Sequence, residues 1–166
     1  VFMGLDVAAA YEGREALLPF VYLEPDRESA LNLLKTGENY CLIPEHFALV
    51  AGLRSGDSFE VIPPDAPETR LRYTVAGVIE FKGWHWFSKM SGTRRHESRT
   101  AAMLFGSYEN IARNFSLNRV NFIWMNLNRD ASEKDLNREL YALAAQNRGE
   151  KYRIAGGGEG EISQEY

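Results

Sequence analysis

The stretch from Tyr40 to Phe81 constrains the fold more than any other part of the chain. It reads, in order, as a short apolar strand, a short helix, a turn, a second strand, a Pro-rich loop and a long strand. The long strand, Leu71 to Phe81, gives the clearest pattern, because apolar and polar side chains alternate along most of its length. This order predicts a small β-rich module in which one helix packs on the strands.

The alternation in the long strand predicts which side chains share a face. The apolar face carries Leu71, Tyr73, Val75, Ile79 and Phe81. The opposite face carries Arg72, Thr74 and Glu80. Gly77 interrupts the apolar face, and a glycine inside a strand is typical of a β-bulge or of a close approach by another part of the chain.

The boundaries of the short helix are also marked. Pro44 suits the first turn, where its missing N–H costs nothing. Gly52 stands where a left-handed cap is needed, and Leu53 can then fold back on the helix. In the turn that follows, Asp57 is interpreted as a residue that stabilises the turn rather than as a catalytic carboxylate.

This ordered series resembles the extracytoplasmic (periplasmic core) domain of MacB-like/FtsX-like ABC transporter permeases. The resemblance rests on Cys41-Leu42-Ile43, Ala48, Gly52-Leu53, Gly56-Asp57 and the run from Tyr73 to Ile79. Pro44 departs from the pattern, because the family often has a Ser or Asn helix cap there. The resemblance implies an α+β fold, in which a β-rich subdomain (strand, helix, hairpin) is inserted next to a porter-like β-α-β subdomain.

The remaining segments can be placed on this plan. Residues 1–39 form an entry strand and, from the cap Asp26, a short helix that belongs to the porter-like or connecting region. Residues 40–105 form the β-rich subdomain. Residues 106–155 form the porter-like subdomain, with a helix from a Ser132 capping box between a strand at 120–127 and a strand at 152–155. Residues 156–166 are Gly-rich and predict a flexible tail.

An irregular segment, residues 83–99, interrupts the β-rich subdomain. It has neither helical nor strand periodicity, and long irregular loops are uncommon in compact domains unless they are functional or disordered. Three interpretations stay open: its aromatic side chains cover one end of the sheet, they form a contact surface for a partner protein, a second permease copy or a membrane, or the segment is a disordered loop with no role. The candidate contact residues are Trp84, Trp86, Phe87, Arg94 and Arg95.

Few residues suggest chemistry. The three histidines and the single cysteine, Cys41, are scattered, so the sequence predicts no metal site and no cofactor. A nucleophilic pair of Cys41 and His46 is the weaker interpretation, because Cys41 lies in apolar strand text and His46 suits a helix surface. The net charge of −4 argues against a nucleic-acid partner.

The resemblance implies a non-catalytic function in a bacterial inner-membrane protein. A cytoplasmic ABC ATPase would drive the membrane helices, and this domain would move on the extracytoplasmic side to promote export, lipoprotein release or signalling. Partners would be the ATPase, a second or sibling permease, and a periplasmic adaptor or lipoprotein. No apolar run here approaches the ~20 residues of a membrane helix, and the chain starts directly in strand-like text, so we expect it to be part of a longer protein. The alternative is a free-standing periplasmic binding or adaptor module.

Overall fold

The computed structural model describes residues 2–11, 18, 20–81, 102–117, 120 and 130–146. The chain divides into two compact units, residues 1–123 and residues 124–166. Each unit is described by itself.

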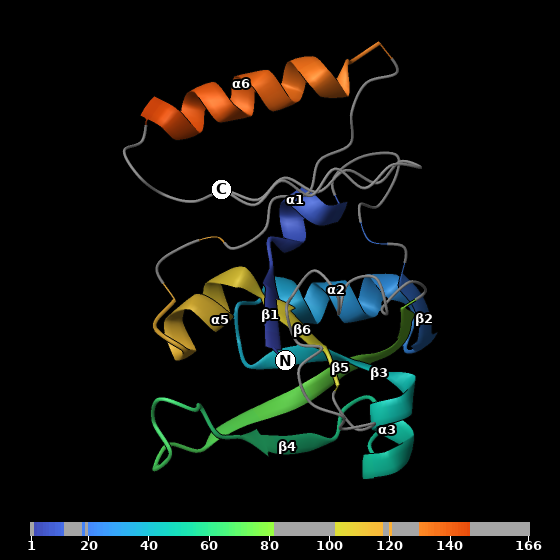
Figure 1. Ribbon diagram of the computed structural model, residues 1–166. Helices are drawn as coiled ribbons and strands as arrows, with labels where there is room; N and C mark the ends of the chain where they lie inside the picture. Colours follow the sequence, from blue (N-terminus) through green and yellow to red (C-terminus); the bar gives the residue numbers. More distant parts are fainter. Residues whose placement is uncertain are drawn as a thin grey trace. The chain divides into compact units, whose positions relative to one another are not determined.

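In the described part of the first unit, six strands form one mixed sheet in the order β1-β6-β3-β5-β2, with β4 also paired to β5. The strands are β1 (Phe2–Leu5), β2 (Phe20–Glu24), β3 (Tyr40–Pro44), β4 (Ser58–Val61), β5 (Leu71–Phe81) and β6 (Leu104–Ser107). The helices in the described part of this unit are α1 (Val7–Tyr11), α2 (Arg27–Lys35), α3 (Glu45–Ala51) and α5 (Tyr108–Asn114). Figure 1 shows the arrangement, and the mixed helices and strands confirm the predicted α+β class.

This one sheet contains strands from more than one of the predicted subdomains. β1 and β2 come from the predicted entry region, whereas β3, β4 and β5 come from the predicted β-rich subdomain. β1 pairs in parallel with β6, and β6 pairs antiparallel with β3. The finer division into subdomains stays a prediction.

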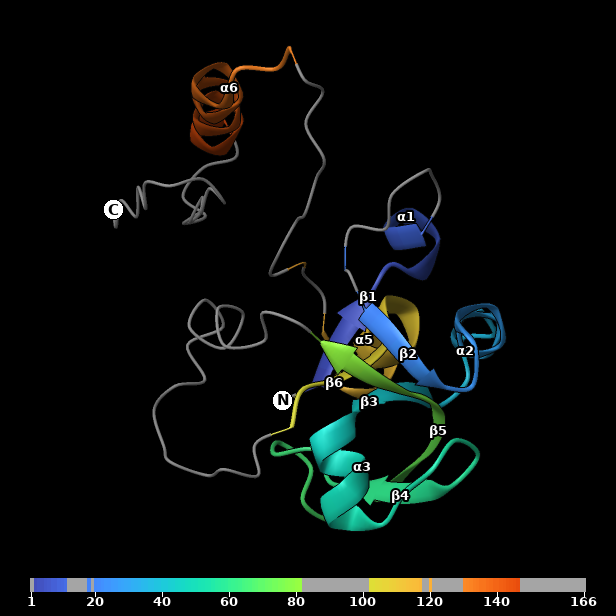
Figure 2. The same cartoon turned by 90° about the vertical axis from the view of Figure 1, so that its right-hand side faces the viewer.

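The strand with the clearest sequence pattern, β5, is the one that pairs with three other strands. It pairs in parallel with β3 and antiparallel with both β4 and β2. β4 pairs with its first half, from Leu71 to Thr74, and β2 pairs with its second half, from Val78 to Phe81. Figure 2 shows β5 curving between these two partners.

A β-bulge in β5 corrects one predicted face. Opposite Cys41 and Leu42 of β3 stand Val75 and Gly77, so β5 contains one extra residue between them. The bulge shifts the alternation by one position, and Val78 rather than Ile79 therefore joins Val75 in the core cluster. The predicted placement of Ile79 on the face of Val75 was wrong, whereas the bulge predicted from Gly77 is confirmed.

Gly77 also lies at a close approach between chain segments. A Cβ atom built there would stand 3.1 Å from Ala30 Cβ of α2 and 3.2 Å from the carbonyl oxygen of Glu24. The sheet and α2 therefore pack as closely as they do because this residue has no side chain.

Helix boundaries follow the capping residues that the sequence marks. The side chain of Asp26 accepts a hydrogen bond from the Ser29 N–H at 3.0 Å, and Ser107 accepts one from the Asn110 N–H at 3.3 Å. Gly52 ends α3 in the left-handed conformation, with φ of 67°. Its neighbour Leu53 packs against the core cluster that contains Ala48, as predicted.

Pro44 differs slightly from its predicted place. It is the last residue of β3 and the N-cap of α3, with φ of −73° and ψ of 149°. The proline ring fixes φ near this value in both strand and helix, and the extended ψ therefore decides that the helix begins one residue later. The side chain makes no cap hydrogen bond.

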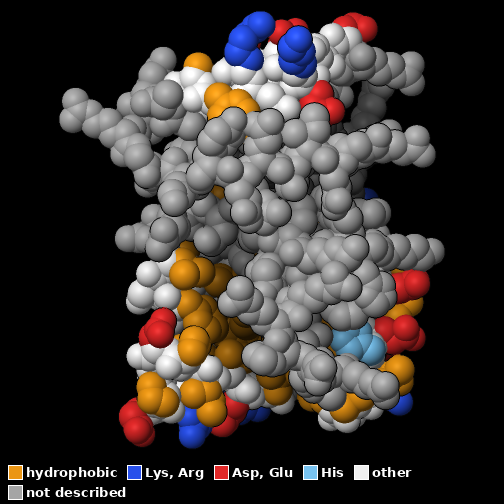
Figure 3. Space-filling model, in the orientation of Figure 1, with side chains coloured by type: hydrophobic (Ala, Val, Ile, Leu, Met, Phe, Trp, Pro, Cys, Tyr) orange, Lys and Arg blue, Asp and Glu red, His pale blue; other side chains and the backbone are white. Residues whose placement is uncertain are grey.

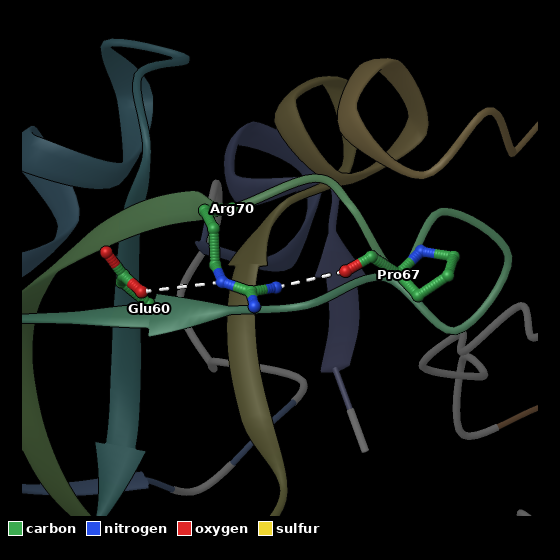
Figure 4. A network of polar contacts seen from close by, with 3 residues as sticks. All are labelled: Glu60, Pro67 and Arg70. Atoms are coloured by element: carbon green, nitrogen blue, oxygen red, sulfur yellow. Dashed lines mark hydrogen bonds and ion pairs between the residues drawn. The ribbon is translucent and has the colours of Figure 1, made fainter.

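The β4–β5 hairpin is joined by the Pro-rich loop that the sequence predicts. Figure 4 shows Arg70 reaching back across this loop: its Nη1 donates to the Pro67 carbonyl oxygen at 3.0 Å, and its Nε lies 3.9 Å from Glu60 Oε2. Both charged side chains are more than half exposed. The ion pair therefore contributes little to the stability of the fold. The loop is held mainly by its own backbone turns.

The second unit contains α6 (Glu133–Gln146) among its described residues. Half of the predicted capping box is present: Ser132 Oγ accepts from the Asp135 N–H at 3.3 Å, whereas the Asp135 carboxylate forms an ion pair with Arg138 at 2.9 Å. Leu136 and Leu140 are half-buried, whereas Leu143 is 54% exposed. Two predicted strands, at 120–127 and 152–155, lie outside the described residues. The exception is Val120, which is described and is not part of a strand.

Candidate functional site

The predicted contact segment lies outside the described residues, together with all five of its candidate contact residues. These are Trp84, Trp86, Phe87, Arg94 and Arg95. The structure does place the two points that flank the segment, which are Phe81 at the end of β5 and Met103 just before β6. Both side chains line the same surface cavity, which we call the Phe81 pocket.

The Phe81 pocket has a volume of about 210 Å³ and lies where the parallel strands β3 and β5 end. Its described lining residues are Pro44, Glu45, His46, Ile79, Glu80, Phe81, Met103 and Phe105. In open sheets, the carboxyl ends of parallel strands are the edge at which ligands commonly bind.

The floor of the pocket is apolar and firmly packed. Ile79 and Phe105 are fully buried, and Met103 is 5% exposed. The Phe81 ring packs edge-on against Phe105, with centroids 5.7 Å apart, and against Phe20 of β2, with centroids 5.1 Å apart. These contacts fix the positions of the rings.

The rim of the pocket is acidic. Glu45 and His46 occupy the first turn of α3, where Pro44 directs the chain out of the sheet, and Glu80 projects from β5. All three side chains are exposed. Two of these three side chains are carboxylates, and no lysine or arginine is found among the described residues that line the pocket.

A second cavity, of about 160 Å³, lies beside α1, α2 and α5. Its described lining includes the charged residues Asp6, Lys35 and Glu109. This mixture of signs gives it no charge preference comparable to that of the Phe81 pocket.

Buried polar side chains gather between α5, β5 and the turn before β3, and we call them the Asn110 network. The Tyr73 hydroxyl donates to Asn110 Oδ1 at 2.7 Å. Asn110 Nδ2 donates to Asn39 Oδ1 at 2.8 Å and to the Gly37 carbonyl at 3.1 Å. Asn114 Nδ2 donates to the Tyr73 hydroxyl at 2.9 Å and to Asn39 Oδ1 at 2.8 Å.

The Asn110 network joins elements that are far apart in sequence. Asn110 and Tyr73 are both fully buried, so their polar groups need the partners that they have here. Burial raises the pKa of the Tyr73 phenol, although the hydrogen bond from Asn114 opposes the shift. The geometry is that of a structural connection, because the short contacts within the network engage the buried polar atoms.

Cys41 and His46 do not act as a pair in this geometry. Cys41 is fully buried in β3, and burial raises the pKa of its thiol, which keeps it in the poorly nucleophilic protonated form. His46 is exposed on α3, as the sequence predicts. In the part of the chain that the structure describes, no three metal-ligating side chains gather in one place.

Asp57 stabilises its turn, as predicted. Its Oδ2 accepts from the Arg54 N–H at 2.8 Å, and its own N–H donates to the Arg54 carbonyl at 3.1 Å. Gly56, in the same turn, has φ of +90°, a conformation that other residues rarely adopt.

The sequence analysis did not identify the Asn110 network or the acidic rim. One signal for the network was present: Asn110 and Asn114 are four residues apart, and a helix over this segment, such as α5, therefore places them on one face. The rim had no such signal, since Glu45 and Glu80 are 35 residues apart and meet only through the parallel pairing of β3 with β5.

No family model matches the chain, and no curated protein matches it either. Among the helices in the described ranges, none has the length and apolar character needed to span a membrane.

Proposed function

We propose that this chain is the extracytoplasmic domain of an ABC transporter permease of the MacB-like/FtsX-like kind. The supporting observation is the structural position of the residues that carry the resemblance. Gly52 and Gly56 adopt positive φ angles of 67° and 90°, Asp57 braces the turn between them and β4, and Gly77 lies at the bulge. The shared pattern thus falls on positions where the backbone requires these residue types, in one continuous α3–β4–β5 unit.

The domain performs no chemistry in this proposal. The cognate cytoplasmic ATPase moves the membrane helices of the parent protein, and the extracytoplasmic domains of two permeases then move relative to each other. Such a domain must transmit force without deforming. The pairing of β5 with three strands and the Asn110 network between β5 and α5 support this role, because both connect distant parts of the first unit.

The alternative is a free-standing periplasmic binding or adaptor module. One specific observation favours it, namely the Phe81 pocket, whose apolar floor and acidic rim resemble a recognition site more than a rigid connector.

Expression of the complete reading frame in its native host, with a tag, tests the choice between these functions. The permease proposal predicts that the product sediments with the inner membrane, that protease added to spheroplasts cleaves this domain, and that an ABC ATPase co-purifies with it. Recovery in the soluble periplasmic fraction would favour the binding module. Protection of this domain in intact spheroplasts, with cleavage only after lysis, would contradict both.

A further inference from the structure

We infer that the second cavity, which we call the Ser107 pocket, binds a small zwitterion. Such a molecule carries an ammonium group and a carboxylate group, and a free amino acid is the simplest example. The inference rests on this cavity alone and does not depend on the permease proposal. Three properties of the cavity lead to it: its place in the fold, its charges, and a buried hydroxyl group with an unused proton.

Helices α2 and α5 cover opposite faces of the sheet. Cys41 and Leu42 are neighbours in β3, so their side chains point to opposite faces. Ile111 of α5 belongs to the same core cluster as Cys41. On the other face, a Cβ atom at Gly77 would meet Leu42 and Ala30 of α2. The sheet therefore lies between these two helices.

The Ser107 pocket lies at the edge of the sheet, where residues of both helices meet the strand ends. β1 ends at Leu5 and β6 ends at Ser107, and these two strands are parallel neighbours. Both residues line the cavity, together with Lys35 at the end of α2 and Glu109 in the first turn of α5. Open sheets with helices on both faces commonly bind their ligands in such a crevice, outside the carboxyl ends of parallel strands.

The charges around the Ser107 pocket are of both signs, and they do not pair with one another. Asp6, Lys35 and Glu109 are exposed and line the cavity. Within the described ranges, none of the three forms an ion pair. Oδ1 of Asp6 accepts from the Ala9 N–H at 3.0 Å, and its other carboxylate oxygen has no hydrogen bond from a described residue. A ligand with one positive and one negative group would therefore find a charge of opposite sign for each.

Ser107 supplies a buried hydrogen-bond donor at the wall of the cavity. Its side chain lies in a residue that is only 7% exposed, and its Oγ accepts from the Asn110 N–H at 3.3 Å. In the part of the chain that the structure describes, its own O–H has no acceptor. A buried donor without an acceptor is costly, and the carboxylate of a ligand that also meets Lys35 would satisfy it.

The volume of about 160 Å³ limits the ligand to a very small molecule. Sites for drug-sized ligands usually have roughly 300–1,000 Å³. A free amino acid carries both charges on a few atoms and therefore suits a cavity of this size.

The test uses the 166-residue chain and three matched small molecules: L-alanine, propionate, which lacks the ammonium group, and ethylamine, which lacks the carboxylate. Amide chemical shifts recorded during each titration measure the affinity and locate the site. We expect L-alanine to bind at least tenfold more tightly than the other two, with the largest shifts at Asp6, Lys35 and Ser107. Equal binding of all three molecules, or no shift with L-alanine at about 10 mM, would overturn the inference.

A matched pair of variants tests the charges. Lys35→Gln/Glu109→Gln removes one charge of each sign from the pocket, whereas Arg54→Gln/Glu68→Gln removes one of each sign from exposed positions outside its lining. We expect at least a fivefold loss of L-alanine affinity for the first variant and less than a twofold change for the second. Equal affinities of the two variants would overturn the inference.

Ser107→Asp tests the hydroxyl donor. Aspartate is also a good N-cap, so α5 keeps its cap, but the donor is replaced by a carboxylate that repels the carboxylate of the ligand. We expect this variant to lose L-alanine binding while its amide spectrum stays that of a folded chain. An unchanged affinity would overturn the inference.

Discussion

The Tyr73 hydroxyl donates a 2.7 Å hydrogen bond to Asn110 Oδ1, across 37 residues of sequence. This bond connects the strand β5 to α5 at a place where both side chains are fully buried. Asn110 completes the connection by donating to Asn39 and to the Gly37 carbonyl. Removal of Asn110 therefore affects three elements together.

Asn110→Ala is expected to lower the free energy of unfolding by about 2–3 kcal/mol, because it leaves buried polar groups of Tyr73 and Asn39 with fewer partners. Tyr73→Phe removes one donor and one acceptor, but Asn110 Oδ1 and Asn114 Nδ2 keep other partners, so it is expected to cost only about 1 kcal/mol. Urea denaturation of the two single variants and the double variant measures both costs and their coupling. Equal costs, or strict additivity in the double variant, would contradict the Asn110 network as described.

Gly77→Ala is expected to destabilise the first unit by about 1–3 kcal/mol, since the new Cβ would stand 3.1 Å from Ala30 Cβ and 3.2 Å from the Glu24 carbonyl oxygen. Thermal denaturation provides the measurement. Ala30→Gly serves as the matched partner, because it removes the nearest of the three crowding groups, which also include the Glu24 carbonyl oxygen and Leu42.

The double variant Gly77→Ala/Ala30→Gly should lose less stability than the sum of the two single variants. If the double variant loses as much stability as the two single variants together, the contact between α2 and β5 does not limit the residue at position 77.

Asp26 gives the stability a specific pH dependence. Hydrogen bonds from the Ser29 hydroxyl and N–H lower the pKa of its carboxyl below the ordinary value of 3.8. Because the pKa is lower in the folded state, the contribution of the Asp26 carboxylate to folding stability is complete above pH 3.8. This contribution is lost as the pH falls through the lower pKa of the folded state.

Asp26→Asn keeps a good N-cap but cannot titrate in this range. We therefore expect the difference in melting temperature between the wild type and Asp26→Asn to be constant near neutral pH and to change only below pH 3.8. A difference that changes between pH 5 and 7 would assign the titration to another group.

The triple variant Trp84→Ser/Trp86→Ser/Phe87→Ser distinguishes two of the interpretations of the aromatic segment. If the segment is a contact surface, the melting temperature should change little, because side chains that meet a partner contribute little to the isolated fold. A large loss of thermal stability would instead mean that these side chains belong to the core of the sheet end.

The local elements of the first unit could be predicted well from sequence, because each boundary has a local physical signal. Asp26, Gly52 and Ser107 cap their helices as their residue types predict. The sheet order could not be predicted in the same way, since the parallel pairing of β1 with β6 joins residues about 100 positions apart and no local pattern encodes such a partner.

The candidate site was less accessible to sequence reasoning than the fold. The predicted face of Ile79 was wrong because a bulge in β5 shifts the alternation of side chains. Gly77 indicated that a bulge was present, but not which residue of β5 was the extra one. The Phe81 pocket forms where β3 and β5 end together, so its rim depends on a strand pairing rather than on a motif.

Figure 3 shows hydrophobic side chains of the first unit gathered at the lower left, over the region that Figure 1 shows as α5 and the β4–β5 hairpin. Partly buried apolar residues that pack against the core cluster include Phe2, Leu71 and Phe115. This surface continues the core of the first unit toward solvent.

In the proposed function, this domain moves when an ATPase acts on the parent protein. The most direct measurement is the distance between spin labels on Glu68→Cys, at the exposed hairpin loop, in two copies of the complete permease purified with its ATPase. Cys41 stays unlabelled because it is fully buried and its thiol pKa is raised by burial. The account predicts one distance distribution without nucleotide and a shifted one with ATP trapped in the ATPase. A parent protein with no ATPase partner, or a distribution that is unchanged by ATP, would contradict it.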